Sequence, residues 1–313
     1  MEYTITKDYR ISKLILGTVA LGMNYGISNA VGQPDISQRF DVLSRARDAG
    51  INTLDTARTY GTAEQTIGDY MEENNSWHCF NIISKFKISG ENLNSYDAVR
   101  EEAFKSVRCS LKKLKLSRLP VCLLHMSRKL DGRLIRKHVP IIFRELIAEN
   151  MIDIAGISVD HPNELEWFED ESVISAYQVP VNIFDHRLMQ DDILYRVHRN
   201  GKLIFARSVF LQGLFFLNPD QLQGTLTAAR PYLLQLHSLA KKEGLTIAEL
   251  AFSYIRHMPP ITSIVFGAES VEQVTQNIRL MNFPALGNNV MDRIKEIFSS
   301  VPEDIVTPGN WVM

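Results

Sequence analysis

Hydrophobic residues recur along the chain in short runs, most of them followed by a stretch with helical spacing. Eight such runs can be distinguished, at residues 14–16, 51–54, 80–84, 121–124, 154–157, 177–179, 203–205 and 261–266. The runs are continuous rather than alternating, as in strands that are buried on both faces. Strands separated by helices pair in parallel, because each crossover must return the chain to the same end of the sheet. The pattern therefore predicts an α/β fold with a parallel sheet.

Several of the helices between these runs have recognisable ends. Asp35 and Gln38 have the spacing of a capping box, and Gly50 is a C-terminal stop for the helix that they begin. Thr62 and Gln65 have the same spacing and predict a second box. Residues 99–114 contain the clearest amphipathic stripe, with basic residues on the opposite face.

The number of repeats favours a closed (β/α)8 TIM barrel over an open doubly wound sheet. No G-x-G-x-x-G follows the first run, which counts further against a Rossmann domain. No linker, charge block or low-complexity tract divides the chain, so we expect one domain over residues 1–313. We expect residues 3–16 to begin with a hairpin that closes the bottom of the barrel. The irregular segment 211–229 should lie on the functional face, and the tail 301–313 is predicted to fold over the site.

Composition narrows the range of partners. The 313 residues are 45% hydrophobic, and the net charge of -2 gives no footprint for nucleic acid or an anionic membrane. No stretch approaches the ~18 apolar residues of a membrane span, and the N-terminus lacks a basic-then-apolar signal. The three cysteines lie outside any C-x-x-C spacing and suit a reducing cytosol, so a cytoplasmic location is expected. The histidines are scattered without metal-ligand spacing, and no metal is expected.

Polar side chains stand where three successive runs end. Asp55 follows the second run, Lys85 the third and His125 the fourth, while Tyr60 lies in the turn after Asp55. Taken alone, Asp55 is equally well explained as an acid in a turn or at an N-cap. Tyr60 alone is typical of a half-buried tyrosine, and His125 alone is typical of a core histidine. Lys85 is harder to account for as structure, because a lysine at the end of a buried strand needs a partner. The carboxyl ends of barrel strands share one face, so these four side chains should meet there.

Together these groups suit proton transfer to a carbonyl oxygen. Tyrosine is a poor acid at neutral pH, with a pKa of ~10, but a lysine cation beside it stabilises the phenolate. Asp55 would hold Lys85 in place, and His125 would hydrogen-bond the substrate oxygen. None of these groups can supply a hydride, so an external donor such as a reduced nicotinamide must bind beside them.

In order and context, these residues resemble the aldo-keto reductase family. The resemblance lies in Asp55-Thr56-Ala57-x-x-Tyr60-Gly61-x-x-Glu64, Ile82-Ile83-Ser84-Lys85 and Leu123-Leu124-His125, and it continues through Gly156-Ile157-Ser158, Gln178-Val179-Pro180-Val181-Asn182, Arg207-Ser208-x-x-x-Gln212-Gly213 and Gly267-Ala268. It implies a barrel that binds NADPH, with NADH as the alternative, and reduces an aldehyde or ketone to an alcohol. It also implies Asp55, Tyr60, Lys85 and His125 as the catalytic residues.

The resemblance further implies a cofactor site. Ser158 and Gln178 would hold the nicotinamide carboxamide, and Gly17 and Thr18 would lie beside the cofactor. The pyrophosphate loop would comprise Arg207, Ser208, Phe210, Gln212 and Gly213, and the adenosine end would contact Gly267, Ala268, Gln273 and Asn277.

This chain departs from the family pattern at three places. Val159 stands where many members have an asparagine that helps to hold the carboxamide. Arg207 replaces an aromatic residue often stacked on the nicotinamide, and its guanidinium could stack there or reach the pyrophosphate. Residues 267–277 contain no Lys or Arg, unlike members selective for a 2′-phosphate, although Arg279 lies close by. The choice between NADPH and NADH is therefore open.

Four residues on the expected functional face are candidates for substrate contacts: Tyr25, Arg58, Lys87 and Arg128. Lys87 sits where some reductases of the family have a large aromatic residue. The cations suggest a polar or anionic carbonyl substrate, such as a sugar derivative, although solvated surface charges account for them equally well. A regulatory or partner subunit that binds the cofactor with little turnover is the alternative function. A barrel isomerase or hydrolase would need phosphate-binding glycines or metal ligands at the late strands.

Overall fold

Eight parallel strands form a closed barrel in the computed structural model, which describes residues 1–6, 8–29, 32–127 and 130–312. The strands are paired in the order β10-β3-β4-β5-β6-β7-β8-β9, and β10 also pairs with β9, which closes the ring. Their bounds are β3 Leu14–Gly17, β4 Thr53–Asp55, β5 Asn81–Phe86, β6 Leu119–His125, β7 Ile152–Ser158, β8 Ile174–Pro180, β9 Leu203–Arg207 and β10 Ser263–Gly267. The predicted (β/α)8 fold is confirmed.

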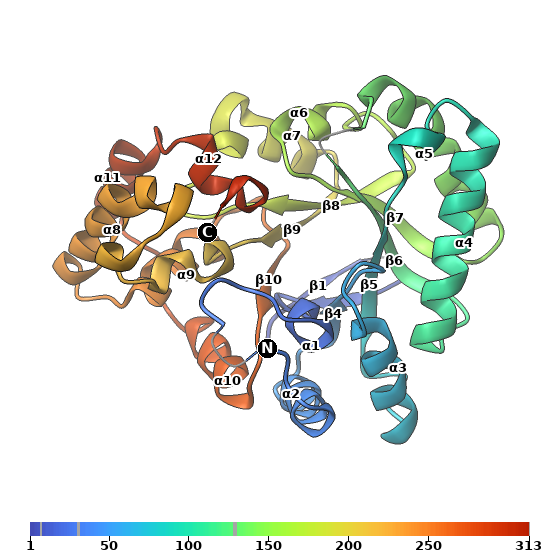
Figure 1. Cartoon of the computed structure of the whole chain (residues 1–313), viewed down its shortest axis with the longest axis horizontal. Coiled ribbons are helices and arrows are strands. Elements are labelled where there is room, and N and C mark those ends of the chain that lie inside the picture. The colour runs from blue at the N-terminus through green and yellow to red at the C-terminus, as the bar shows by residue number, and fades with distance from the viewer. Residues whose placement is uncertain (7, 30–31, 128–129, 313) are drawn as a thin grey trace.

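Helices surround the strands on the outside (Figure 1). They are α1 Val19–Gly22, α2 Ile36–Asp48, α3 Ala63–Glu73, α4 Tyr96–Leu114, α5 Gly132–Ala148, α6 Pro162–Glu166, α7 Ile193–Arg199, α8 Arg230–Lys242, α9 Ile247–Arg256, α10 Val271–Leu280, α11 Asn288–Phe298 and α12 Glu303–Val306. Short 3-10 helices lie in the connections: η1 Gly90–Asn92, η2 Arg187–Asp192, η3 Leu211–Phe216, η4 Pro219–Gln221, η5 Gly224–Ala229 and η6 Pro308–Asn310. Among the described residues, no helix is long and apolar enough to cross a membrane.

One of the two predicted capping boxes is present. The Gln38 backbone nitrogen donates to Asp35 at 2.9 Å, the Asp35 nitrogen donates to Gln38 at 3.0 Å, and Gly50 follows α2 with a φ of +80°. The second box was predicted wrongly. Thr62 does not have the extended backbone of an N-cap and makes no capping hydrogen bond, and the Gln65 amide donates to Asp69 at 2.8 Å instead.

The bottom of the barrel is closed by the expected hairpin, in which β1 Tyr3–Ile5 pairs antiparallel with β2 Arg10–Ser12. The Tyr9 hydroxyl in its turn donates to Asp153 near the start of β7. Ile11 of the hairpin packs into an apolar cluster with Ile15, Ile83, Val121, Leu123, Ala176 and Phe205. A second, larger cluster fills the space between the strands and the helices. Because both faces of the strands are packed, their carboxyl ends form a rigid platform.

The tail is tied to the segment that follows β9. The Thr225 nitrogen donates to the Val312 carbonyl, and the Val312 nitrogen donates to the Thr225 hydroxyl, each at 3.0 Å. Ile305 and Val306 of α12 are buried. This anchoring places residues 306–310 at the edge of a cavity at the carboxyl ends of the strands, as the sequence predicted.

Candidate active site

The four residues predicted to be catalytic lie together at the carboxyl ends of β4, β5 and β6. Lys85 is fully buried, and its Nζ donates to Asp55 Oδ1 at 2.6 Å and to the Thr56 carbonyl at 3.0 Å. The same Nζ lies 4.9 Å from the centroid of the Tyr60 ring. The Tyr60 and His125 rings meet edge to face, with centroids 6.3 Å apart. One phenol is thus flanked by an ammonium group and an imidazole.

Burial sets the protonation state of two of these groups. It is the main cause that raises the pKa of Tyr60 above its ordinary value, with the Asp55 carboxylate raising it further, while Arg207 acts in the opposite direction. Burial also lowers the pKa of His125 to about 2, assisted by the cations of Lys85 and Lys87. Tyr60 is therefore a neutral phenol and His125 a neutral imidazole, and each can donate a hydrogen bond to a carbonyl oxygen.

Burial and an ion pair act in opposite directions on Lys85. Desolvation lowers its pKa, and the Asp55 carboxylate raises it both through charge and through their hydrogen bond. Without Asp55, a lysine at this depth would lose much of its tendency to remain protonated. Asp55 thus favours the cationic form of Lys85 beside Tyr60.

A chain of hydrogen bonds connects this group to the two residues expected to hold a carboxamide. Gln178 Nε2 donates to the same Asp55 Oδ1 at 2.6 Å, and the Ser158 hydroxyl donates to Gln178 Oε1 at 3.1 Å. Both side chains are buried; Ser158 is the last residue of β7, and Gln178 lies two residues before the end of β8. Of the two, Gln178 lines the adjoining cavity, and Ser158 does not belong to its lining.

A cavity of about 600 Å³ extends from Asp55, Tyr60 and His125 to α10. The predicted cofactor residues that line it are Gly17, Gln178, Arg207, Ser208, Phe210, Gln212, Gly213, Gly267, Ala268, Gln273 and Asn277. Thr18 is buried outside the lining and donates its hydroxyl to the Asp55 carbonyl at 2.9 Å. The Asn277 Oδ1 atom is buried and has no partner among the described residues. An unsatisfied acceptor of this kind fits a ligand with amino groups such as an adenine.

The loop after β9 has an unusual backbone that shapes this cavity. Ser208, Leu211, Gln212 and Gly213 all have positive φ. Gly213 has a φ of +93°, and a Cβ atom on it would lie 2.0 Å from the Ser28 hydroxyl oxygen, so any side chain there would be strained and would displace Ser28. The Ile27 nitrogen donates to the Gln212 carbonyl at 3.1 Å, which joins the loop after β3 to the loop after β9 beside the cavity.

A second cavity, of about 330 Å³, meets the first at His125. Residues common to the two linings are His125, Asp160, Arg207, Ser208 and Gln212. The smaller cavity is further lined by Lys87, Arg187 and residues 306–310 of the tail. The arrangement provides one compartment for a long ligand and another for a small one, with His125 where they join.

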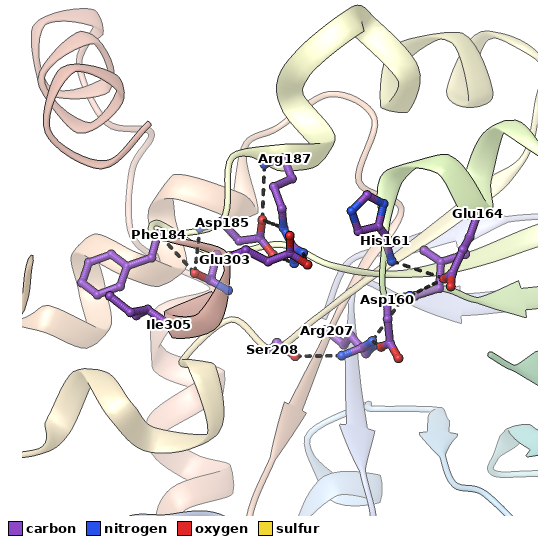
Figure 2. A network of polar contacts seen from close by, with 12 residues as sticks. Asp160, His161, Glu164, Phe184, Asp185, Arg187, Arg207, Ser208, Glu303 and Ile305 are labelled. Carbon is purple, nitrogen blue, oxygen red and sulfur yellow. Dashed lines mark hydrogen bonds and ion pairs between the residues drawn. The ribbon is translucent and has the colours of Figure 1, made fainter. Parts of the chain in front are cut away.

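Three ion pairs brace the walls of the smaller cavity (Figure 2). Arg207 donates to the Asp160 carboxylate, to the Val159 carbonyl at 2.9 Å and to the Ser208 hydroxyl at 3.1 Å. Arg187 donates to Asp185 at 2.7 Å and to Glu303 of the tail at 3.1 Å. Sequence reasoning missed Asp160, Asp185 and Arg187. The position of Asp160 just past the β7 strand end was the one available signal.

The four predicted substrate residues have different surroundings. Tyr25 lines the larger cavity and Lys87 the smaller. Arg58 lines neither cavity; its guanidinium donates to Glu64 at 2.8 Å, and the other oxygen of that buried carboxylate accepts from Ser84 at 2.7 Å. Arg128 lies outside the described residues. Within the described part of the chain, no group of three or more His, Cys, Asp or Glu side chains could hold a metal ion.

The barrel and its site define an aldo-keto reductase, and the chain belongs to the aldo/keto reductase family, whose model matches residues 13–299. It is 25% identical to the uncharacterized oxidoreductase YqkF of Bacillus subtilis, with 96% of each chain covered. It is 22% identical to a probable voltage-gated potassium channel subunit beta of Oryza sativa, with 90% of this chain and 94% of the relative covered. Among solved structures, the holo form of the aldo-keto reductase AKR11C1 from Bacillus halodurans has a TM-score of 0.75 at 21% identity, with 98% and 99% covered.

Membership of this family makes the chain an NAD(P)H-dependent oxidoreductase that acts on carbonyl and alcohol groups. Its cofactor is a nicotinamide dinucleotide, as the resemblance implied: NADPH, with NADH as the alternative. The larger cavity, with the unsatisfied amide oxygen of Asn277 at one end and Tyr60 and His125 at the other, fits such a molecule.

Proposed function

We propose that the chain reduces a polar, anionic aldehyde or ketone, such as a sugar-derived carbonyl compound, to the alcohol. The observation that carries this proposal is the junction of the two cavities at His125, beside a phenol whose neighbouring lysine is held by a buried carboxylate. The larger cavity would hold the dinucleotide and the smaller one the carbonyl substrate.

The proposed mechanism divides the work among the chain's own residues. A bound nicotinamide would supply the hydride. Gln178, supported by Ser158, would orient the carboxamide, and the loop from Ser208 to Gly213 would hold the pyrophosphate. His125 would donate a hydrogen bond to the carbonyl oxygen, and Tyr60 would pass its hydroxyl proton to that oxygen. Lys85 would stabilise the phenolate left behind, because its charge lies close to the ring.

Replacement of Tyr60 tests this assignment. Tyr60→Phe should bind NADPH and NADH about as tightly as the parent, as measured by fluorescence titration. Its turnover should fall by about 10²- to 10⁴-fold, the usual contribution of a general acid. Tyr177→Phe is the matched control, since Tyr177 is a buried barrel tyrosine whose hydroxyl has no partner among the described residues. Retained turnover in Tyr60→Phe would remove Tyr60 from the mechanism.

The anionic character of the substrate is inferred from Lys87. Arg187 and Arg207 are each paired with a carboxylate, whereas Lys87 is exposed and has no ion-pair partner among the described residues. Lys87 also lies close enough to His125 to help lower the pKa of the imidazole. An uncompensated cation at a cavity wall attracts an anionic substrate.

Substrate comparison with a Lys87 variant tests this inference. Lys87→Gln should raise KM for a phosphorylated sugar aldehyde by about three- to fivefold, in line with a solvent-exposed ion pair, and leave KM for a neutral aldehyde unchanged. Lys105→Gln, on the exposed part of α4, is the control. A strong preference of the parent for a flat aromatic aldehyde over the sugar derivative would contradict the proposal.

A cofactor-binding regulatory or partner subunit is the second candidate, favoured by the likeness to a probable potassium channel subunit beta. The intact group of Asp55, Tyr60, Lys85 and His125 supports the enzyme instead. Incubation with reduced cofactor and a panel of short aldehydes distinguishes the two functions. A regulatory subunit would bind the cofactor without consuming it.

A further inference from the structure

The charges around the larger cavity are unevenly distributed. Asp55, Asp160 and Arg207 lie in the part that contains Tyr60 and His125. Around the part formed by β10 and α10, Glu269 is the one charged side chain among the described lining residues. The part of the cavity formed by β10 and α10 therefore has a single charged group among its described lining residues, the Glu269 carboxylate.

Glu269 is held in place by the start of α10. It lies two residues past the end of β10 and precedes Ser270, whose side chain caps the helix. The Glu269 backbone nitrogen donates to Gln273 Oε1 at 2.7 Å, which fixes the segment. This local hydrogen bond orients the residue without occupying its carboxylate.

The Glu269 carboxylate accepts few hydrogen bonds. Its hydrogen bond from Gln273 Nε2 is 3.5 Å long, at the limit of such an interaction. Burial raises the pKa of Glu269, and the contact with Gln273 only opposes that effect. A partly buried carboxylate with this environment gains from a further hydroxyl or amide donor.

The neighbouring helix offers the cavity no cation. Gln273, Gln276, Asn277 and Leu280 of α10 line the cavity at helical spacing, and the first three are neutral amides. Arg279 does not belong to the lining. A phosphate dianion placed against this wall would meet Glu269 and no compensating positive charge among the described lining residues.

We propose that Glu269 determines how the chain distinguishes NADH from NADPH. In this assignment its carboxylate accepts a hydrogen bond from the 2′-hydroxyl of the adenosine ribose in NADH and repels the 2′-phosphate of NADPH. The chain then binds NADH at least as tightly as NADPH. The inference rests on the proposed function, because it requires the adenosine half of a dinucleotide to lie at the α10 end of the cavity. A carboxylate that selects a ribose diol and a cation that selects a 2′-phosphate follow the same chemistry in dinucleotide sites of other folds.

Titration of the full chain with NADH and NADPH in parallel tests the proposal by binding alone, with protein fluorescence as the readout. In Glu269→Gln, the ratio of the NADPH Kd to the NADH Kd should fall about three- to tenfold, because repulsion is removed and an acceptor is weakened. Glu269→Lys should lower the ratio further and make NADPH the preferred form. Glu272→Gln, in the first turn of the same helix, removes the same charge away from the cavity lining and should leave the ratio unchanged.

Two results would overturn the proposal: a parent that binds NADPH more than tenfold tighter than NADH, or a Glu269→Gln variant whose ratio stays within twofold of the parent's. Thermal melting of each variant shows that the compared proteins are folded. Binding of both dinucleotides with an unchanged ratio refutes the role of Glu269 and leaves the proposed function standing. Absence of binding by the folded parent refutes both.

Discussion

Lys85 and Asp55 form a buried ion pair whose members depend on each other. Lys85→Met should leave the Asp55 carboxylate in the core with its charge uncompensated and lower the free energy of unfolding by about 3–5 kcal/mol. Urea denaturation measures this loss. The double variant Asp55→Asn, Lys85→Met removes both charges and should recover most of the stability, but none of the turnover.

The double variant also separates stability from catalysis. If it proved as unstable as Lys85→Met, the cost would come from packing of the lysine stem rather than from the unpaired charge. If it kept turnover, neither residue would be needed to tune Tyr60.

Residues at strand ends could be predicted from the sequence, and residues in the turns beyond them could not. Asp55, Lys85 and His125 close apolar runs, and parallel strands bring such positions to one face. Asp160 and Glu269 each lie two residues past a strand, where the turn conformation decides the direction of the side chain. Arg58 and Glu64 were not recognised as partners, because they are six residues apart across a turn. Thr62 has the residue type of an N-cap without the backbone that a cap requires.

At the level of elements, the position of Tyr60 depends on contact between two backbones. Gly22 ends α1 and Gly61 follows Tyr60. A Cβ atom on Gly22 would lie 1.9 Å from the Tyr60 carbonyl oxygen, and one on Gly61 would lie 2.2 Å from the Gly22 carbonyl oxygen. The Thr62 nitrogen donates to the Gly22 carbonyl at 3.0 Å. Because neither glycine has a side chain, the end of α1 can pack directly against the backbone of the turn that contains Tyr60 and fix its position.

Gly22→Ala should therefore move Tyr60 rather than unfold the barrel. We expect kcat to fall by about tenfold to a hundredfold, because an ångström-scale misplacement of a catalytic group has effects of that size. The loss of stability should be about 1–3 kcal/mol, as for other overpacked sites. Steady-state kinetics and urea denaturation measure the two effects. Gly90→Ala, where a Cβ atom would first meet Leu130 at 4.0 Å, is the control, and an unchanged kcat in Gly22→Ala would show that the turn is adaptable.

Hydrophobic periodicity was enough to predict the eight strands and their parallel arrangement, because a short, continuous apolar run between two helical segments is typical of a strand buried on both faces. It did not locate strand ends accurately. The run at 51–54 corresponds to a strand at Thr53–Asp55, whose limits are set by pairing with Gly17 and Ile83 on its neighbours. The segment 211–229 was predicted as irregular loop, and it contains 3-10 helices interrupted by left-handed residues. Such a backbone leaves no periodic signal in the sequence.

At the scale of the whole molecule, the buried imidazole of His125 makes stability depend on pH. Its pKa is lowered to about 2 in the folded chain, whereas an unfolded histidine has a pKa of ~6.5. Between these two values, the unfolded state binds a proton that the folded state does not. The contribution of His125 to stability is complete above pH ~6.5 and is lost as the pH falls, by up to about 1.4 kcal/mol per pH unit.

His125→Gln should reduce this sensitivity to acid. Between pH 7 and pH 5, the loss in free energy of unfolding should be smaller in His125→Gln than in the parent, by up to about 2 kcal/mol. Urea denaturation at both pH values measures this difference. The buried His186 also has a lowered pKa, but it is present in both proteins and does not affect the difference. His198→Gln, at an exposed position, should behave like the parent. Equal pH dependence in His125→Gln and the parent would mean that folding does not lower the pKa of His125.

One oxygen of Asp55 accepts hydrogen bonds from both Lys85 and Gln178, and this sharing constrains how the site can evolve. One donor belongs to the residues proposed to transfer the proton, and the other to the residues proposed to hold the cofactor. A substitution at Gln178 that changed how the cofactor is bound would also remove a hydrogen bond from the Asp55 carboxylate. That carboxylate favours the charged form of Lys85. The two halves of the site are therefore not free to drift separately. Descendants that alter one half are expected to have altered the other as well.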